Sequence, residues 1–290
     1  MHSVRPWPAL RDTVLTTTVD GLWALQVLTG IETIAPELGL RPHLPSVEPK
    51  QLALQHPVTA ELRDVGAVEE CGAVDPTVVE WLTVLSRRDV ALVLHIRTPR
   101  DDEPARVLLA RFAQWWVVLE RSADLIRISG AGTATAEGTA DTVLNQQIER
   151  LCGRNEPAPL RPVTLDAGAM RSAAAGQEAL QTFLAGQRVD ADQLRLLTLA
   201  ADPDRSAQAS VVAAQSGVET GRFQRTHVEA GAVTIIDTLE GRLVAEEVDH
   251  GGTTWMIIAP GTRSNIAAAI NRMMRRLPAH QDWHSYRKVV

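Results

Sequence analysis

The sequence predicts an α+β fold in which a central, mainly antiparallel β-sheet is flanked by two helical groups. Two observations support this fold class. Each half of the chain has helical segments first, then about four strand-like segments, then one closing helix. The strand-like segments follow one another through short turns, which is typical of antiparallel meanders. The repeated order predicts a pseudo-twofold arrangement of the halves 1–160 and 161–290 within one compact unit.

The first half begins with a β-branched strand at 13–19, after which Asp20 stands where a helix N-cap is expected. Helices are then expected at 50–66 and 76–87, the second because a capping residue precedes Pro76 at its start. The remaining elements expected in this half are strands at 90–96, 106–112, 115–120 and 125–128, and a helix at 139–151.

The second half repeats this order after the proline-rich segment 154–162. Its expected elements are helices at 165–175, 177–186 and 190–200, strands at 209–215, 232–237, 242–248 and 254–258, and a last helix at 264–277. Ser264 is the expected N-cap of the last helix and Pro278 its stop.

Trp115 and Trp116 are adjacent in an apolar strand, so their side chains point to opposite faces of the sheet. The sheet is then apolar on both faces at this strand and needs cover on both. Helices of the same chain would supply that cover, or part of one face would be left for a partner protein.

Composition narrows the function classes. The net charge of −6 argues against a nucleic-acid partner, because binding to phosphates needs a basic surface. The longest apolar runs are far below the ~20 residues needed to span a bilayer, and the N-terminal residues have no apolar signal segment. Two cysteines do not make a disulfide framework. The sequence therefore predicts a cytoplasmic protein without membrane insertion.

Three weak patterns have ordinary structural explanations. Gly130–Thr135 resembles a dinucleotide-binding loop, but its third glycine is replaced and a proline linker stands where an acidic residue should follow, so a flexible turn is expected. His280 and His284 have a zinc-like spacing but follow Pro278 and lack an obvious third ligand. His95 lies in an apolar strand and is expected in the core. No catalytic residue, metal or cofactor is therefore expected, and we do not expect an enzyme.

Eight segments in order along the chain carry a family resemblance. They are Asp20–Gln26, Ala35–Pro45, Trp81–Leu85, Gln114–Arg121, Glu149–Gly153, Ala158–Thr164, Ala200–Pro203 and Ser285–Val290. Together they resemble the EspG family of ESX (type VII) secretion-associated proteins, in particular the branch associated with the second ESX locus. The resemblance implies a cytoplasmic chaperone that binds the tip of a PE–PPE heterodimer, keeps it soluble and targets it to its secretion system.

The resemblance also implies where the partner binds. The family's binding regions correspond here to the loop Arg97–Pro104, a sheet face and the helices at about 177–200. We therefore expect the partner-binding residues to include Arg100, Asp101, Asp102, Phe183, Leu184 and Leu197. The charged residues would form a polar rim, while the apolar residues would divide between packing the helices and anchoring the partner.

The sequence leaves other function classes open. One is a small-molecule-binding α/β enzyme that uses the Gly130–Thr135 turn, and another is a winged-helix-like regulator built on residues 50–98. A homodimer is a further open alternative. The particular PE–PPE client and the way in which it is released are not specified by the sequence.

Overall fold

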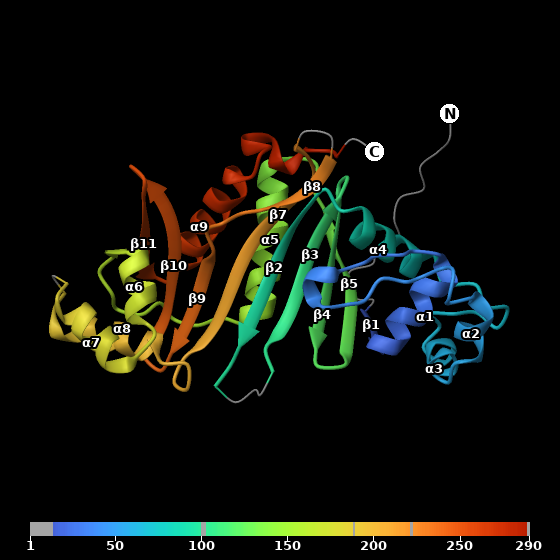
Figure 1. Cartoon of the computed structure of the whole chain (residues 1–290), viewed down its shortest axis with the longest axis horizontal. Helices are drawn as coiled ribbons and strands as arrows, with labels where there is room; N and C mark the ends of the chain where they lie inside the picture. The colour runs from blue at the N-terminus through green and yellow to red at the C-terminus, as the bar shows by residue number, and fades with distance from the viewer. Residues whose placement is uncertain (1–13, 100–102, 188, 221–222, 289–290) are drawn as a thin grey trace. The chain divides into compact units, whose positions relative to one another are not determined.

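The computed structural model describes residues 14–99, 103–187, 189–220 and 223–288 (Figure 1). The chain divides into two compact units. The first unit takes the chain up to Ala91, Arg106–Val143 and His284–Val290. The second unit takes Leu92–Ala105 and Leu144–Trp283. The division falls within two strands, one α-helix and one 3-10 helix, and the residues from His284 onward belong to the first unit.

The first unit contains a strand, a group of helices and a meander. The strand β1 (Val14–Thr18) leads into α1 (Val19–Thr29), the 3-10 helix η1 (Pro36–Leu38), α2 (Lys50–Gln55), α3 (Val58–Asp64) and α4 (Pro76–Arg87). The strands are β2 (Val90–Arg97), which the division splits, β3 (Ala105–Phe112), β4 (Trp115–Ser122) and β5 (Leu125–Thr133). Strands β3, β4 and β5 pair in antiparallel order, and β1 pairs with β5.

The second unit repeats this order of elements. After α5 (Glu137–Cys152), which the division also splits, come β6 (Val163–Asp166), α6 (Ala167–Ala173), α7 (Gln177–Ala185) and α8 (Ala191–Ala201). Then follow β7 (Ala207–Thr220), β8 (Phe223–Val228), β9 (Val233–Thr238), β10 (Gly241–His250), β11 (Thr253–Pro260), α9 (Arg263–Arg276) and η2 (His280–His284).

Antiparallel pairs join β7 to β8 and β9, β9 to β10, β10 to β11, and β11 to β6. In both units, the first strand therefore pairs with the last strand of the meander. The repeated α+β plan predicted from the sequence is confirmed.

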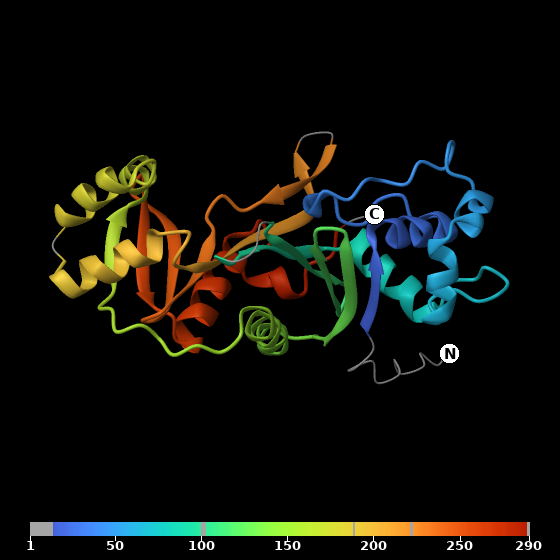
Figure 2. The ribbon, with the colours of Figure 1, turned by 90° about the horizontal axis from the view of Figure 1, so that it is seen from below.

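Helices cover both faces of the β9–β11 sheet in the second unit. On β10, Leu243 and Ala245 belong to the apolar core that α7 and α8 cover. Glu246, on the opposite face, accepts hydrogen bonds from Arg272 of α9. This alternation is the period of two that a strand imposes on its side chains. Figure 2 shows α9 and the α6–α8 group on different sides of these strands.

Cover on both faces is also seen at β4 in the first unit. Its consecutive residues Trp116–Leu119 are all at most 1% exposed, although neighbours in a strand point to opposite faces. Helix α4 packs against β4 and β5. Trp115 at the strand's start is half-buried. The prediction that the sheet needs cover on both faces at this strand is confirmed.

Glu48 holds the segment between η1 and α2 against α1. Its carboxylate is 7% exposed and accepts hydrogen bonds from Trp23 Nε1 at 2.9 Å and from the Leu44 N–H at 2.7 Å. His43 Nδ1 and the Arg41 guanidinium lie 3.0 and 2.7 Å from its oxygens. Burial raises the pKa of Glu48, but these hydrogen bonds and the Arg41 charge outweigh burial and lower the pKa to about 2.

Two buried charged side chains hold the C-terminal tail. Arg111 of β3 donates hydrogen bonds to the carbonyl oxygens of His284 and Tyr286, each at 2.7 Å. Asp89, at the start of β2, accepts a hydrogen bond from the Lys288 N–H at 3.1 Å. Both Arg111 and Asp89 are 0% exposed, so these tail groups replace water as their partners. Burial of Arg111 lowers its pKa to about 10.

Two helices begin at other residues than expected. Thr18 caps α1 in place of Asp20, and its hydroxyl accepts a hydrogen bond from the backbone of the first turn. Thr262 caps α9 in the same way in place of Ser264. In both cases a hydroxyl-bearing residue two positions earlier takes the role, because the cap needs an extended backbone just before the first helical residue.

Three further elements differ from the predicted ones. The expected helix 50–66 is two helices, because Pro57 has no N–H for a helical bond and separates α2 from α3. The helix expected at 165–175 begins at Ala167, because the residues before it form β6. The strand β8 was not predicted, and it pairs with the second part of β7. Its partner is a long strand that continues well beyond the expected end at 215.

The segment Gly130–Thr135 is not a flexible turn. Most of it lies in β5, where Val117 pairs with Gly130 and Trp116 pairs with Gly132, so that one extra residue forms a β-bulge. A main chain engaged in this ladder is not the loop that a dinucleotide requires, so the enzyme alternative loses the feature on which it was based. His95, expected in the core, is exposed on β2.

Candidate partner-binding surface

The helices α7 and α8 form a pair with a short connection. Helix α7 ends at its C-cap Gly186. Helix α8 begins after Asp190, whose carboxylate accepts a hydrogen bond from Gln193 N at 2.9 Å, while the Gln193 side chain returns to the Asp190 N–H. This reciprocal capping box fixes the start of α8.

The three apolar residues predicted to contact a partner have different surroundings. Leu184 and Leu197 are 0% and 2% exposed and belong to the core between the helices and the sheet. Phe183 is half-buried and packs at the border of that core. Leu184 and Leu197 thus pack the helical pair, whereas Phe183 keeps part of its ring at the surface.

The charged residues predicted to form the rim belong to the connection between β2 and β3. Arg100, Asp101 and Asp102 lie outside the described residues. Their proposed role in partner binding therefore stays a prediction.

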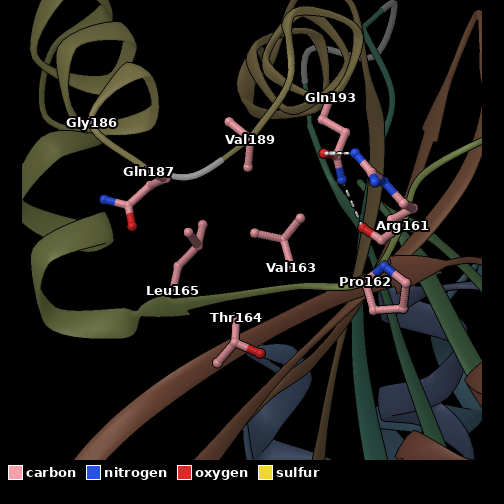
Figure 3. A pocket seen from close by; sticks show the side chains of 9 residues that line it. All are labelled: Arg161, Pro162, Val163, Thr164, Leu165, Gly186, Gln187, Val189 and Gln193. Carbon is pink, nitrogen blue, oxygen red and sulfur yellow. Dashed lines mark hydrogen bonds between the residues drawn. The ribbon is translucent and has the colours of Figure 1, made fainter.

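A pocket of about 650 Å³ lies beside β6. Val163 and Leu165 of β6 point into it, together with Val189 from the α7–α8 connection, while Thr164 points away (Figure 3). This alternation again follows from the strand geometry. The pocket thus has an apolar floor built by two neighbouring elements.

Polar side chains close one end of this pocket. Gln193 donates from Nε2 to the carbonyl oxygen of Arg161 at 3.1 Å, and Arg161 pairs with Asp190 at 2.5 Å. The Gln193 N–H holds the pKa of Asp190 below its usual value, and Arg161 adds to this effect. Within the described part of the chain, the pocket lining has no carboxylate, imidazole or thiol, so it offers shape and hydrogen bonds rather than acid–base or nucleophilic chemistry.

A second pocket of about 500 Å³ lies over α7 and α8. Its lining comprises Gln181, Ala185, Leu194, Arg195, Thr198, Leu199, Arg205 and Glu240. The neighbouring turn between β9 and β10 carries Leu239, which is 90% exposed. Sequence reasoning missed Leu239, although an apolar residue in a two-strand turn is a usable signal. Leu239 and the apolar residues of this pocket make an apolar surface, and Arg195, Arg205 and Glu240 lie at its edge.

The described residues contain no group of three His, Cys, Asp or Glu side chains placed to hold a metal ion. His280 and His284 lie at the two ends of η2. None of the helices in the described ranges is long and apolar enough to cross a membrane.

The chain as a whole matches a known family. The model of the EspG family matches residues 18–272, most of the chain. The protein belongs to the EspG family, whose members among its relatives are named as ESX secretion-associated proteins. The resemblance inferred from the eight sequence segments is confirmed.

Individual relatives show which members of the family this chain is similar to. The chain is 50% identical over 277 residues to the ESX-2 secretion-associated protein EspG2 of Mycobacterium tuberculosis, covering 96% of this chain and 100% of the relative. It is 25% identical to the ESX-5 secretion-associated protein EspG5 of Mycobacterium marinum, covering 96% and 98%. The structure of M. tuberculosis EspG5 in complex with a PE25–PPE41 dimer has the same fold, with a TM-score of 0.72 at 22% identity, covering 94% of this chain and 100% of EspG5.

Proposed function

We propose that this chain is a cytoplasmic, non-enzymatic chaperone that binds the tip of a PE–PPE heterodimer, keeps the heterodimer soluble and targets it to an ESX secretion system. The observation that carries the proposal is the shared fold with a protein described as a type VII secretion system chaperone in complex with a PE–PPE dimer. The 50% identity to an ESX-2 secretion-associated protein supports a client from that system.

The surface over α7 and α8 suits this role. A chaperone for an apolar tip needs a few apolar anchors and a polar rim that sets the orientation of the client. Phe183 and Leu239 supply exposed apolar area in the second unit, and Arg195 and Arg205 lie in the neighbouring pocket. The β2–β3 loop with Asp101 and Asp102 is the proposed second part of the rim, where charges tune the choice of client more than the affinity.

Co-expression tests the proposal. We expect the PE and PPE proteins encoded beside this chain to become soluble when the chain is present and to co-purify with it on size-exclusion chromatography. A PE–PPE pair from another ESX locus is the matched control and should stay insoluble or elute separately. If the neighbouring pair remains insoluble and never co-purifies, the chaperone assignment is wrong.

A further inference from the structure

Four basic side chains gather in the first unit, at the end of α4 and on the C-terminal tail. They are Arg87, Arg88, Arg287 and Lys288, here called the Arg87–Lys288 cluster. The buried carboxylate of Asp89 brings them together, because it follows Arg88 in sequence and accepts hydrogen bonds from the Lys288 N–H at 3.1 Å and from Arg287 Nη1 at 3.3 Å. Docking of the tail therefore adds two cations to the two at the end of α4.

The acidic groups nearest to the cluster are already engaged. Arg88 pairs with Glu37 and also donates to the carbonyl oxygen of Leu85 at 2.6 Å. Asp89 is 0% exposed and accepts a further hydrogen bond from the Ala113 N–H at 3.0 Å. Among the residues that the structure describes, neither the Arg87 guanidinium nor the Lys288 amine has an ion-pair or hydrogen-bond partner. Within the described residues, the cluster therefore carries positive charge that no acidic side chain neutralises.

The electrostatics of Lys288 reflect this excess. Burial lowers the pKa of the Lys288 ammonium most, Asp89 raises it, and the charges of Arg88 and Arg87 lower it again. Repulsion between like charges that the fold keeps together costs free energy, and a bound anion would relieve it. The cluster is also accessible, because Arg87 is exposed and the Arg287 side chain is 51% exposed.

We propose that the Arg87–Lys288 cluster is a docking surface for an acidic segment of a partner protein. The chain as a whole carries a net charge of −6, so an acidic partner is repelled by the average surface and attracted at this cluster. Such a local reversal of charge both speeds association and fixes the orientation of the partner. With Arg88 buried against Glu37, the three remaining cations of the cluster are too few for nucleic acid, where each neutralised phosphate needs its own cation along an extended path.

The test uses the full chain and a fluorescein-labelled octaglutamate peptide, with fluorescence anisotropy at about 50 mM salt. We expect Arg87→Glu and Lys288→Glu each to weaken binding of the peptide by about fivefold or more, because each reverses an unpaired cation of the cluster. Arg127→Glu is the matched control: Arg127 is exposed on β5 of the same unit and the change in net charge is identical. This control should alter binding by less than about twofold, and raising the salt to about 300 mM should weaken binding to the unaltered protein.

Two results would overturn the proposal directly. One is the absence of peptide binding to the unaltered protein, and the other is an equal loss in Arg127→Glu, which would mean that only net charge matters. Tighter binding of an eight-nucleotide single-stranded DNA, with the same dependence on Arg87 and Lys288, would assign the surface to nucleic acid instead. If a reversal lowers the melting temperature, Arg87→Gln and Lys288→Gln remove the same charges without adding new ones and decide between these results.

Discussion

At the scale of single residues, burial separates the adjacent tryptophans of β4. Trp116 is 1% exposed, whereas Trp115 is half-buried. We expect Trp116→Ala to lower the free energy of unfolding by about 3–5 kcal/mol, because a fully buried indole leaves a large cavity. Trp115→Ala should cost clearly less. Urea unfolding of both variants measures the difference, and equal large losses would show that Trp115 is as much a core residue as Trp116.

Glu48 is a second residue whose effect can be measured alone. We expect Glu48→Gln to lower the free energy of unfolding at pH 7 by about 2 kcal/mol, since a neutral amide satisfies the surrounding donors less well than a carboxylate. Because folding lowers the pKa of Glu48 from 4.5 to about 2, its contribution is complete above pH 4.5 and is lost as the pH falls towards 2.

Urea unfolding of the wild type and of Glu48→Gln at several pH values checks this prediction. The difference between the two proteins should shrink steadily below pH 4.5. Glu61→Gln, at an exposed position of α3, is the control and should change stability by less than about 0.5 kcal/mol. A difference that is constant with pH would show that the charge of Glu48 is not what stabilises this segment.

At the scale of elements, local signals were predictable and distant pairings were not. Both bounds of α4 were predicted as the structure has them. Its start was the clearer of the two, because the capping residue Asp75 and Pro76 mark it in two adjacent positions. The strand β6 was missed, because its four residues are stabilised by β11, which lies far along the chain. The pocket beside β6 was missed for the same reason, since a strand and a helical connection build it together.

The helical pair α7–α8 gives the prediction for client binding. We expect Phe183→Ser and Leu239→Ser each to weaken binding of the PE–PPE client by about tenfold, because both remove apolar area from the proposed anchor surface. Leu239 is 90% exposed, so its substitution should leave the melting temperature unchanged, whereas Phe183 also borders the core.

Isothermal titration calorimetry with circular dichroism on each variant measures both effects. Leu52→Ser is the matched control, because Leu52 is 47% exposed on α2 in the other unit. Unchanged affinity in correctly folded Leu239→Ser and Phe183→Ser would move the binding surface away from α7 and α8.

At the scale of the whole molecule, the two units share one order of elements, and this repetition made the fold class predictable. Which residues belong to each unit was not predictable, because the first unit includes residues from the far end of the sequence. The apolar pattern of the C-terminal tail does not indicate that Arg111 and Asp89 form hydrogen bonds with it. The contact depends on backbone carbonyl and N–H groups of the tail, which every sequence possesses.

Because the C-terminal tail is synthesised last, the first unit is completed late during synthesis. Asp89 and Arg111 are synthesised before half of the chain has been made, yet their backbone partners at 284–288 are added only after the entire second unit. Until then the guanidinium and the carboxylate must remain hydrated, which opposes burial of the strand ends that carry them. The first unit therefore reaches its final packing only after residues 284–288 have been added, although most of its strands are made early. A chain truncated before residue 284 would thus leave the first unit unfinished and open to proteases.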